Sequence, residues 1–86
     1  MAFVYDGPTI AGFWMKDTTI PLSVAFWDSA HRIVQILDMQ PCSADPCPLY
    51  FPNESYVGAV EANQGYFARH GVKNGDHVDL IVFGST

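Results

Sequence analysis

Basic side chains are scarce in this 86-residue chain: Lys16, Arg32, Arg69 and Lys73 stand against nine acidic residues, and the net charge is −5. Binding to a phosphate backbone draws its affinity from clustered lysines and arginines. The four cations are scattered along the chain instead. This distribution argues against a nucleic-acid partner and against an anionic membrane surface, and the acidity most simply serves solubility.

Long apolar runs are also missing. No stretch reaches the roughly 18 apolar residues of a membrane span, and the opening residues 1–5 do not form a signal peptide. Hydrophobic residues nevertheless make up 49% of the chain and aromatic residues 14%, which is ample for one core. A chain of this size buries roughly 60–65% of the surface that its unfolded form exposes. We therefore expect one soluble domain over residues 1–86.

Cysteine is limited to Cys42 and Cys47. Redox-active pairs usually have two residues between the cysteines, whereas four lie between these. A zinc site would need about two further ligands, and the nearest candidates, His70 and His77, do not form a recognisable ligand pair. The favoured interpretation is a structural disulfide, with a redox couple and a metal site as alternatives. We expect no metal and no cofactor.

Apolar and polar residues mostly alternate with a period of two, which predicts a mainly β protein. The segments 22–27 and 32–37 form a predicted hairpin across the short turn 28–31. The other predicted strands are 56–62, 77–83, and the shorter 3–5 and 12–15, which a Gly7–Pro8 turn would join.

One helix is predicted from about residue 64 to residue 70. Asn63 is a suitable cap for its start, and Gly71 is placed to end it in the left-handed conformation. A second structural signal follows at Gly75 and Asp76, where a glycine permits positive φ and an aspartate can accept backbone N–H groups across a turn. This turn resembles the "GD box" of cradle-loop barrels.

The segment 41–52 holds four of the six prolines and is predicted to be a loop, because proline cannot donate to a sheet ladder. It also carries Leu49, Tyr50 and Phe51, which favour burial. A long loop with its own apolar anchors is often functional.

Three segments together resemble the domain-of-unknown-function family 192 (DUF 192) of bacteria and archaea. They are 13–22 (FWMKDTTIPL), 41–50 (PCSADPCPLY) and 68–78 (ARHGVKNGDHV), in the family order. The resemblance implies a compact, mainly β fold and no established activity. Many relatives carry export signals or lipoprotein anchors, which implies an extracytoplasmic location.

The chain departs from the family in two ways. Asp17 stands where most relatives are expected to have asparagine. Residues 1–5 align with a later strand of the family domain, so a preceding strand and a Gly-Leu-Met segment are expected to be missing here, either in a minimal member or in a shortened chain. An exposed strand edge left by that loss would favour homo-oligomerisation.

The candidate binding surface combines the turn at Lys16, Asp17 and Thr18 with the loop from Pro41 to Pro52. Alternatively, the turn has only a structural role, in which the Asp17 carboxylate accepts hydrogen bonds from the backbone N–H groups that follow it. For Glu61 we favour a solvated, edge-facing side chain over a buried one, which would need a partner such as Lys16 or Arg69. The complete list of candidates is Trp14, Lys16, Asp17, Thr18, Asp45, Tyr50 and Glu61.

The predicted fold is a small, partly open β-barrel of cradle-loop type with one short helix and a Pro-rich loop. The leading functional hypothesis is a non-catalytic, extracytoplasmic binding or accessory module for an unknown ligand or protein. The first alternative is a hydrolase-like enzyme that uses Asp17, Asp45 or Glu61 as acid or base, in which case two of these carboxylates must converge in a concave pocket. The second is a metal or redox protein that uses the two cysteines.

Overall fold

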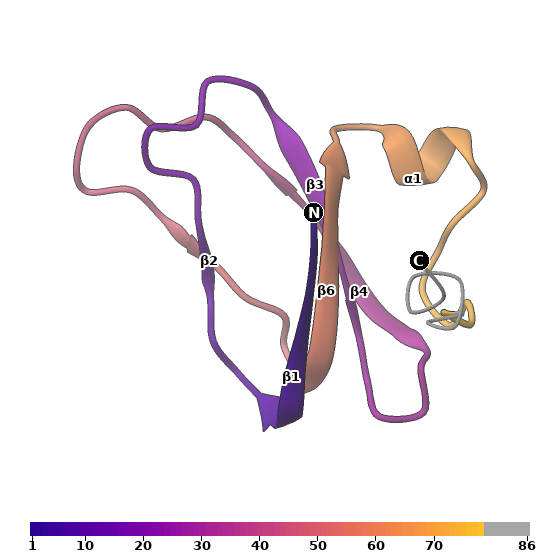
Figure 1. Cartoon of the computed structure of the whole chain (residues 1–86). Helices are drawn as coiled ribbons and strands as arrows, with labels where there is room; N and C mark the ends of the chain where they lie inside the picture. Colours follow the sequence, from indigo (N-terminus) through magenta and orange to yellow (C-terminus); the bar gives the residue numbers. More distant parts are fainter. Residues whose placement is uncertain (79–86) are drawn as a thin grey trace.

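A four-stranded antiparallel sheet forms the centre of the molecule. The computed structural model describes residues 1–78. In the sheet, β3 (Leu22–Trp27) pairs with β4 (Ile33–Met39) on one side and with β6 (Tyr56–Asn63) on the other. The edge strand β1 (Ala2–Thr9) pairs with β6, so the strand order is β1-β6-β3-β4 (Figure 1).

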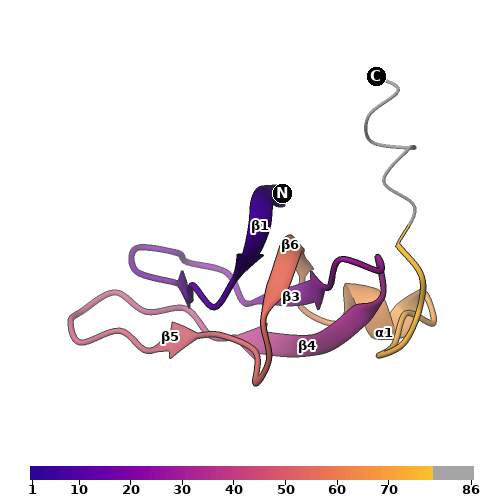
Figure 2. The same ribbon diagram turned by 90° about the horizontal axis from the view of Figure 1, so that it is seen from below.

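Two smaller elements cover the sheet. A two-stranded sheet of β2 (Phe13–Trp14) and β5 (Leu49–Tyr50) lies on one side, and the helix α1 (Tyr66–Arg69) lies on the other (Figures 1 and 2). The helix is only four residues long. Within residues 1–78 there is no helix with the length and apolar character needed to cross a membrane.

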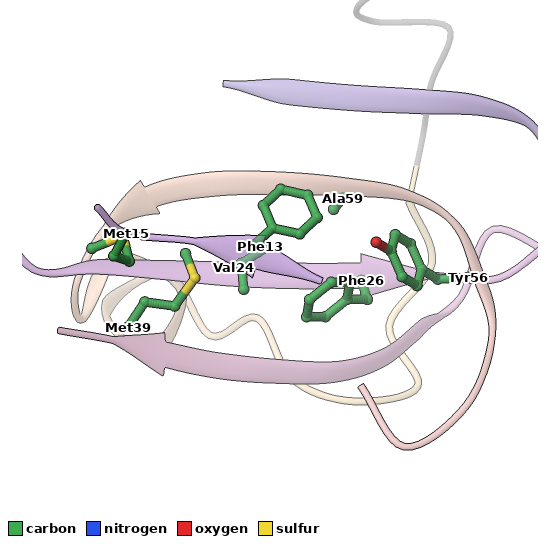
Figure 3. Close-up of a cluster of buried hydrophobic side chains, with 7 residues drawn as sticks. All are labelled: Phe13, Met15, Val24, Phe26, Met39, Tyr56 and Ala59. Carbon is green, nitrogen blue, oxygen red and sulfur yellow. The ribbon is translucent and has the colours of Figure 1, made fainter. Parts of the chain in front are cut away.

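The central strand β3 is buried on both faces, because successive side chains of a strand point in opposite directions. Val24 and Phe26 enter the main core, which they share with Phe13, Met15, Met39, Tyr56 and Ala59 (Figure 3). Ala25 points the other way, into a second cluster with Ile33 and with Phe67 of α1. The apolar alternation read from the sequence thus supplies two cores rather than one.

The predicted hairpin is confirmed. β3 and β4 pair from Leu22↔Met39 to Trp27↔Ile33, with an irregularity beside Trp27. The carboxylate of Asp28 accepts the backbone N–H groups of Ala30 (3.0 Å) and Arg32 (3.1 Å) and so stabilises the turn.

Two expected loop segments contain strand. β1 continues through Gly7 and Pro8, where a turn was predicted, with a register irregularity between Val4 and Thr9. An edge strand tolerates this proline because only one side of it is paired. The Pro-rich segment contains β5, since Leu49 and Tyr50 pair with β2.

The helix start was also predicted wrongly. Asn63 pairs with Leu22 at the end of β6 and does not cap a helix. The residue before α1 is Gly65, which has φ +89° and makes no side-chain capping bond. Strand pairing overrides the capping preference here. Gly71, after the helix, has φ +71°, as predicted for the residue that ends it.

The mainly β class is confirmed, but residues 1–78 do not close into a barrel. Their large sheet is open, with β1 and β4 at opposite edges. The predicted strand 77–83 lies outside the described residues from position 79 onward. Within the described part, His77 forms a single bridge with Arg32, directly before β4.

Candidate functional site

The turn at residues 16–18 and the Pro-rich loop lie side by side in the structure. Cys42 forms isolated bridges with Lys16 and Thr18, and the backbone N–H of Asp17 donates to the Cys42 carbonyl at 2.8 Å. Asp17 has φ +63°, in the left-handed region that aspartate tolerates better than most residues. Tertiary contact therefore joins the two segments that the sequence suggested as one surface.

An ion pair joins the turn to the loop. Lys16 Nζ lies 2.7 Å from Asp45 Oδ2 and 5.6 Å from the centre of the Trp14 ring. The Lys16 and Asp45 side chains are 37% and 60% exposed, and ion pairs this accessible to solvent contribute about 0–1 kcal/mol. The pair orients the loop more than it stabilises the fold.

The loop is closed covalently. Cys42 and Cys47 form a disulfide, with Cα atoms 5.9 Å apart, and the Asp45–Pro46 peptide bond inside this ring is cis. The disulfide occupies both cysteines of the chain. Residues 1–78 also contain no cluster of three or more His, Cys, Asp or Glu side chains that could hold a metal ion.

Pairing between β2 and β5 divides their side chains into an inner and an outer set. Phe13 is opposite Tyr50 on the inner side, and Trp14 is opposite Leu49 on the outer side. Phe13 is only 8% exposed, and Tyr50 packs against the same core while its hydroxyl accepts the N–H of Gln40. Tyr50, a predicted binding residue, thus lies on the inner side and anchors the loop.

The outer side chains form an apolar patch, which we define as Ile10, Trp14, Leu49 and Phe51. Their exposed fractions are 75%, 56%, 59% and 57% respectively. Beside Trp14, a depression of about 450 Å³ is lined by Ile10, Leu49, Phe51 and Pro52, with Asn53 and Glu54 at its polar side. Gly12 makes the close approach possible, since a β-carbon there would lie 3.3 Å from the Leu49 Cβ.

A second groove of about 330 Å³ lies between β1 and β2, and we call it the aromatic groove. Its lining residues are Phe3, Tyr5, Gly12, Phe13, Trp14 and Glu61. Glu61 is opposite Val24 in the β6–β3 pairing, so its side chain emerges on the core face of the sheet and is half-buried. The expectation of a solvated, edge-facing Glu61 is therefore wrong, because strand register assigned the side chain to the core face.

Burial has a measurable chemical consequence for Glu61. Loss of solvation raises the pKa of its carboxyl above the ordinary value of 4.5, and the Met1 amino group partly opposes this rise. Below the groove, burial and the neighbouring Tyr5 raise the pKa of Tyr56 to about 12. The Tyr56 hydroxyl donates to the Ala11 carbonyl and holds the segment before β2 against the core.

The three acidic candidates do not converge. Asp45 pairs with Lys16, Glu61 lies in the aromatic groove, and Asp17 is exposed in the turn. Neither of the two grooves described above is lined by two of these side chains. Nor does the Asp17 carboxylate bond to downstream amides within residues 1–78; the turn is held by backbone bonds, including Thr18 N–H to the Met15 carbonyl (3.0 Å).

A third depression of about 270 Å³ lies beside α1, where the Ser23 hydroxyl donates to Asp38 Oδ1 at 2.8 Å. It is remote from the predicted site. Ile10, Phe3 and Tyr5 also line grooves, although none of them was among the residues predicted for the site. The signal available for Phe3 and Tyr5 was the spacing of two aromatic residues two positions apart, which puts both on one face of a strand.

Comparison with known proteins decides the family. The sequence model of DUF192, described as Uncharacterized ACR, matches residues 1–80. The chain belongs to the DUF192 family. A comparison with curated proteins gives no match.

Two crystal structures are similar to this DUF192 chain. One is a protein of unknown function from Novosphingobium aromaticivorans, with 32% identity and a TM-score of 0.79 over 92% of the chain. The other is described as a candidate transcription regulator from Sinorhizobium meliloti, with 26% identity and a TM-score of 0.77 over 92% of the chain. The chain spans 55% and 60% of the length of these two proteins.

Proposed function

We propose that this DUF192 chain is a non-catalytic binding module that acts outside the cytoplasm. Its contact surface consists of the apolar patch, the turn at residues 16–18 and the Pro-rich loop. The observation that carries the proposal is the exposure of Trp14, Leu49 and Phe51. They lie on or next to β2 and β5, whose inner residues Phe13 and Tyr50 pack on the core. Exposed apolar groups that gather in one place mark interaction sites.

The patch is built to keep its shape. The Cys42–Cys47 disulfide closes the loop. Phe13 and Tyr50 pack on the core and fix the inner side of β2 and β5, and Lys16 forms an ion pair with Asp45 at the edge of the patch. Side chains held in place before binding lose little conformational entropy when a partner arrives. This preorganisation favours binding over a purely structural role for the loop.

A protein that offers apolar side chains is the partner that suits the patch. Trp14 and Phe51 are residue types enriched at the energetic centres of protein interfaces, and polar groups of Lys16, Asp45 and Asn53 surround them. Because the acidic candidates are dispersed, the geometry required for acid–base hydrolysis is not met within residues 1–78. The extracytoplasmic location is supported by the disulfide, since such bonds persist in oxidising compartments.

The proposal is tested by panning a phage-displayed library of random peptides against the oxidised chain. We expect enriched peptides to contain aromatic and aliphatic residues, and synthetic versions to lose about tenfold or more in affinity for Leu49→Asp and for Phe51→Ala. Tyr66→Ala is the matched control, because Tyr66 is also an exposed aromatic but lies on α1. Peptides that bind Leu49→Asp as tightly as the unaltered chain, or a failure to enrich any peptide, would contradict the proposal.

Location is tested in the native organism with a membrane-impermeant thiol reagent added to intact cells after mild reduction. We expect Cys42 and Cys47 to be labelled only after reduction. Labelling that requires cell lysis would contradict an extracytoplasmic location.

A further inference from the structure

The depression in the apolar patch has one apolar side and one acidic side. Its apolar side is lined by Ile10, Leu49, Phe51 and Pro52. Glu54 is the only charged residue that lines it. We propose that the protein partner inserts a large apolar side chain here and places a lysine or arginine next to it, against Glu54. This inference rests on the protein-binding function proposed above and names the chemistry of the segment that binds.

Both walls of the depression are anchored to the main sheet. On one wall, the Tyr56 hydroxyl of β6 donates to the Ala11 carbonyl. On the other wall, Pro52 is buried, and the Asn53 backbone N–H donates to Gln35 Oε1 of β4 at 2.9 Å. The volume of about 450 Å³ lies within the roughly 300–1,000 Å³ of pockets that hold small organic groups. A preformed space of this size suits a tryptophan or leucine side chain.

The charge of Glu54 is not neutralised by the described part of the chain. Within residues 1–78 its carboxylate forms no ion pair, and no lysine, arginine or histidine lines the depression. Lys16, at the edge of the patch, is paired with Asp45 at 2.7 Å. An unpaired carboxylate beside an apolar surface attracts a cation on the partner and repels an anion. The net charge of −5 adds to this preference.

Lysine and arginine also suit the apolar side of the depression. Their hydrocarbon stems lie along apolar surface while the charged ends stay in water. An aspartate or glutamate at the same position of the partner would bring a second carboxylate close to Glu54. Charge therefore decides which of the apolar segments that fit the depression bind most tightly.

The test uses three synthetic peptides in which a tryptophan, in a glycine–serine background, is followed by lysine, glutamine or glutamate. Each peptide is titrated into the isotope-labelled, oxidised chain and followed by NMR. We expect the amide resonances of Gly12 and Leu49 to shift, with the affinity falling from lysine through glutamine to glutamate. The lysine peptide should bind about threefold more tightly than the glutamine peptide, and high salt should reduce this difference. Glu54→Lys should reverse the order.

Asp6→Lys is the matched control. It changes the net charge by the same amount at an exposed position that does not line the depression, so the order of the peptides should persist. Equal affinities of the three peptides, an unchanged order in Glu54→Lys, or a lysine peptide that does not bind would overturn the inference.

Failure of this inference is distinguishable from failure of the proposed function. If the three peptides bind equally and all lose affinity in Leu49→Asp, the charge preference is wrong and the protein-binding surface stands. If none of them binds and panning also enriches no peptide, both proposals are wrong.

Discussion

The indole of Trp27 packs directly against the backbone of Gly58, its partner on the neighbouring strand. A β-carbon added to Gly58 would lie 2.1 Å from Cζ2 of Trp27, far inside van der Waals contact. Trp27 is fully buried, so its ring has no free space to move into. The absence of a side chain at position 58 is therefore a packing requirement of the sheet.

Gly58→Ala is expected to destabilise the chain by about 1–3 kcal/mol, the usual cost of overpacking a core. Urea unfolding followed by tryptophan fluorescence measures the change. The matched control is Gly7→Ala, because a β-carbon at Gly7 meets nothing within 4 Å. Equal stability of the Gly58 variant and the unaltered chain would contradict the packing described here.

Removal of the disulfide by Cys42→Ser together with Cys47→Ser should lower the free energy of unfolding by about 2 kcal/mol, because the bond closes a short loop. The unaltered chain under strong reductant should show the same loss. Mass spectrometry of the denatured, unreduced chain should give a mass two hydrogens below that of the reduced chain. A full mass, or a zinc adduct that denaturation removes, would contradict the disulfide.

Glu61 should make the stability fall as the pH rises. Its pKa is raised in the folded chain, so above 4.5 the unfolded chain releases this proton first and the folded state binds more protons. The free energy of unfolding therefore decreases from about pH 4.5 upward through the raised folded pKa.

Glu61→Gln removes this component, so the variant should gain stability relative to the unaltered chain near neutral pH and lose that advantage in acid. Urea unfolding across the pH range measures it, with Glu54→Gln in the exposed loop as the control. Parallel pH profiles for Glu61→Gln and the unaltered chain would refute the assignment.

Asp76 should act in the opposite direction. Its carboxylate accepts the Lys73 backbone N–H at 2.9 Å and pairs with Lys73 Nζ at 3.2 Å, and these contacts, the backbone bond first, lower its pKa below 3.8. A lowered folded pKa gives stability that is present above 3.8 and is lost as the pH falls through the folded value.

Asp76→Asn should accordingly lower the Tm at neutral pH, and the difference from the unaltered chain should shrink on acidification. Thermal melts at several pH values check this, with the exposed Asp6→Asn as the control. A Tm difference that stays constant into strong acid would show that the Asp76 charge plays no part.

Local chemistry made three strands, the hairpin between two of them and the turn at Gly75 and Asp76 predictable, but not the strand through Gly7 and Pro8 or the strand β5. The alternation of apolar and polar residues predicted β3, β4 and β6. Gly75, with φ +88°, adopts the left-handed conformation that a glycine before Asp76 in a turn favours. The pairing of Cys42 with Cys47 was also accessible, since both lie in one short loop. The start of the helix after Gly65 could not be predicted, because Asn63, the expected cap, pairs with Leu22 in the sheet.

The candidate surface could be assembled only partly from the sequence, since Ile10, Leu49 and Phe51 of the apolar patch were not among the predicted candidates. Sequence patterns pointed to Trp14, Lys16, Asp17 and Asp45, and the structure brings their segments together through β2–β5 pairing and the Lys16–Asp45 contact. Whether Trp14 or Phe13 faces outward depends on which side of β2 meets the core. A strand of two residues carries too little alternation to decide that.

Sequence alone therefore determined the mainly β class, the family, the hairpin and the disulfide, because these depend on motifs and patterns of residues close together in the chain. Tertiary structure decided the open sheet of residues 1–78, the inward position of Tyr50 and the half-buried carboxylate of Glu61. Each of these depends on the register of strands far apart in sequence. A shift of one residue in that register moves a side chain to the opposite face, and no local pattern at Glu61 or Tyr50 encodes it.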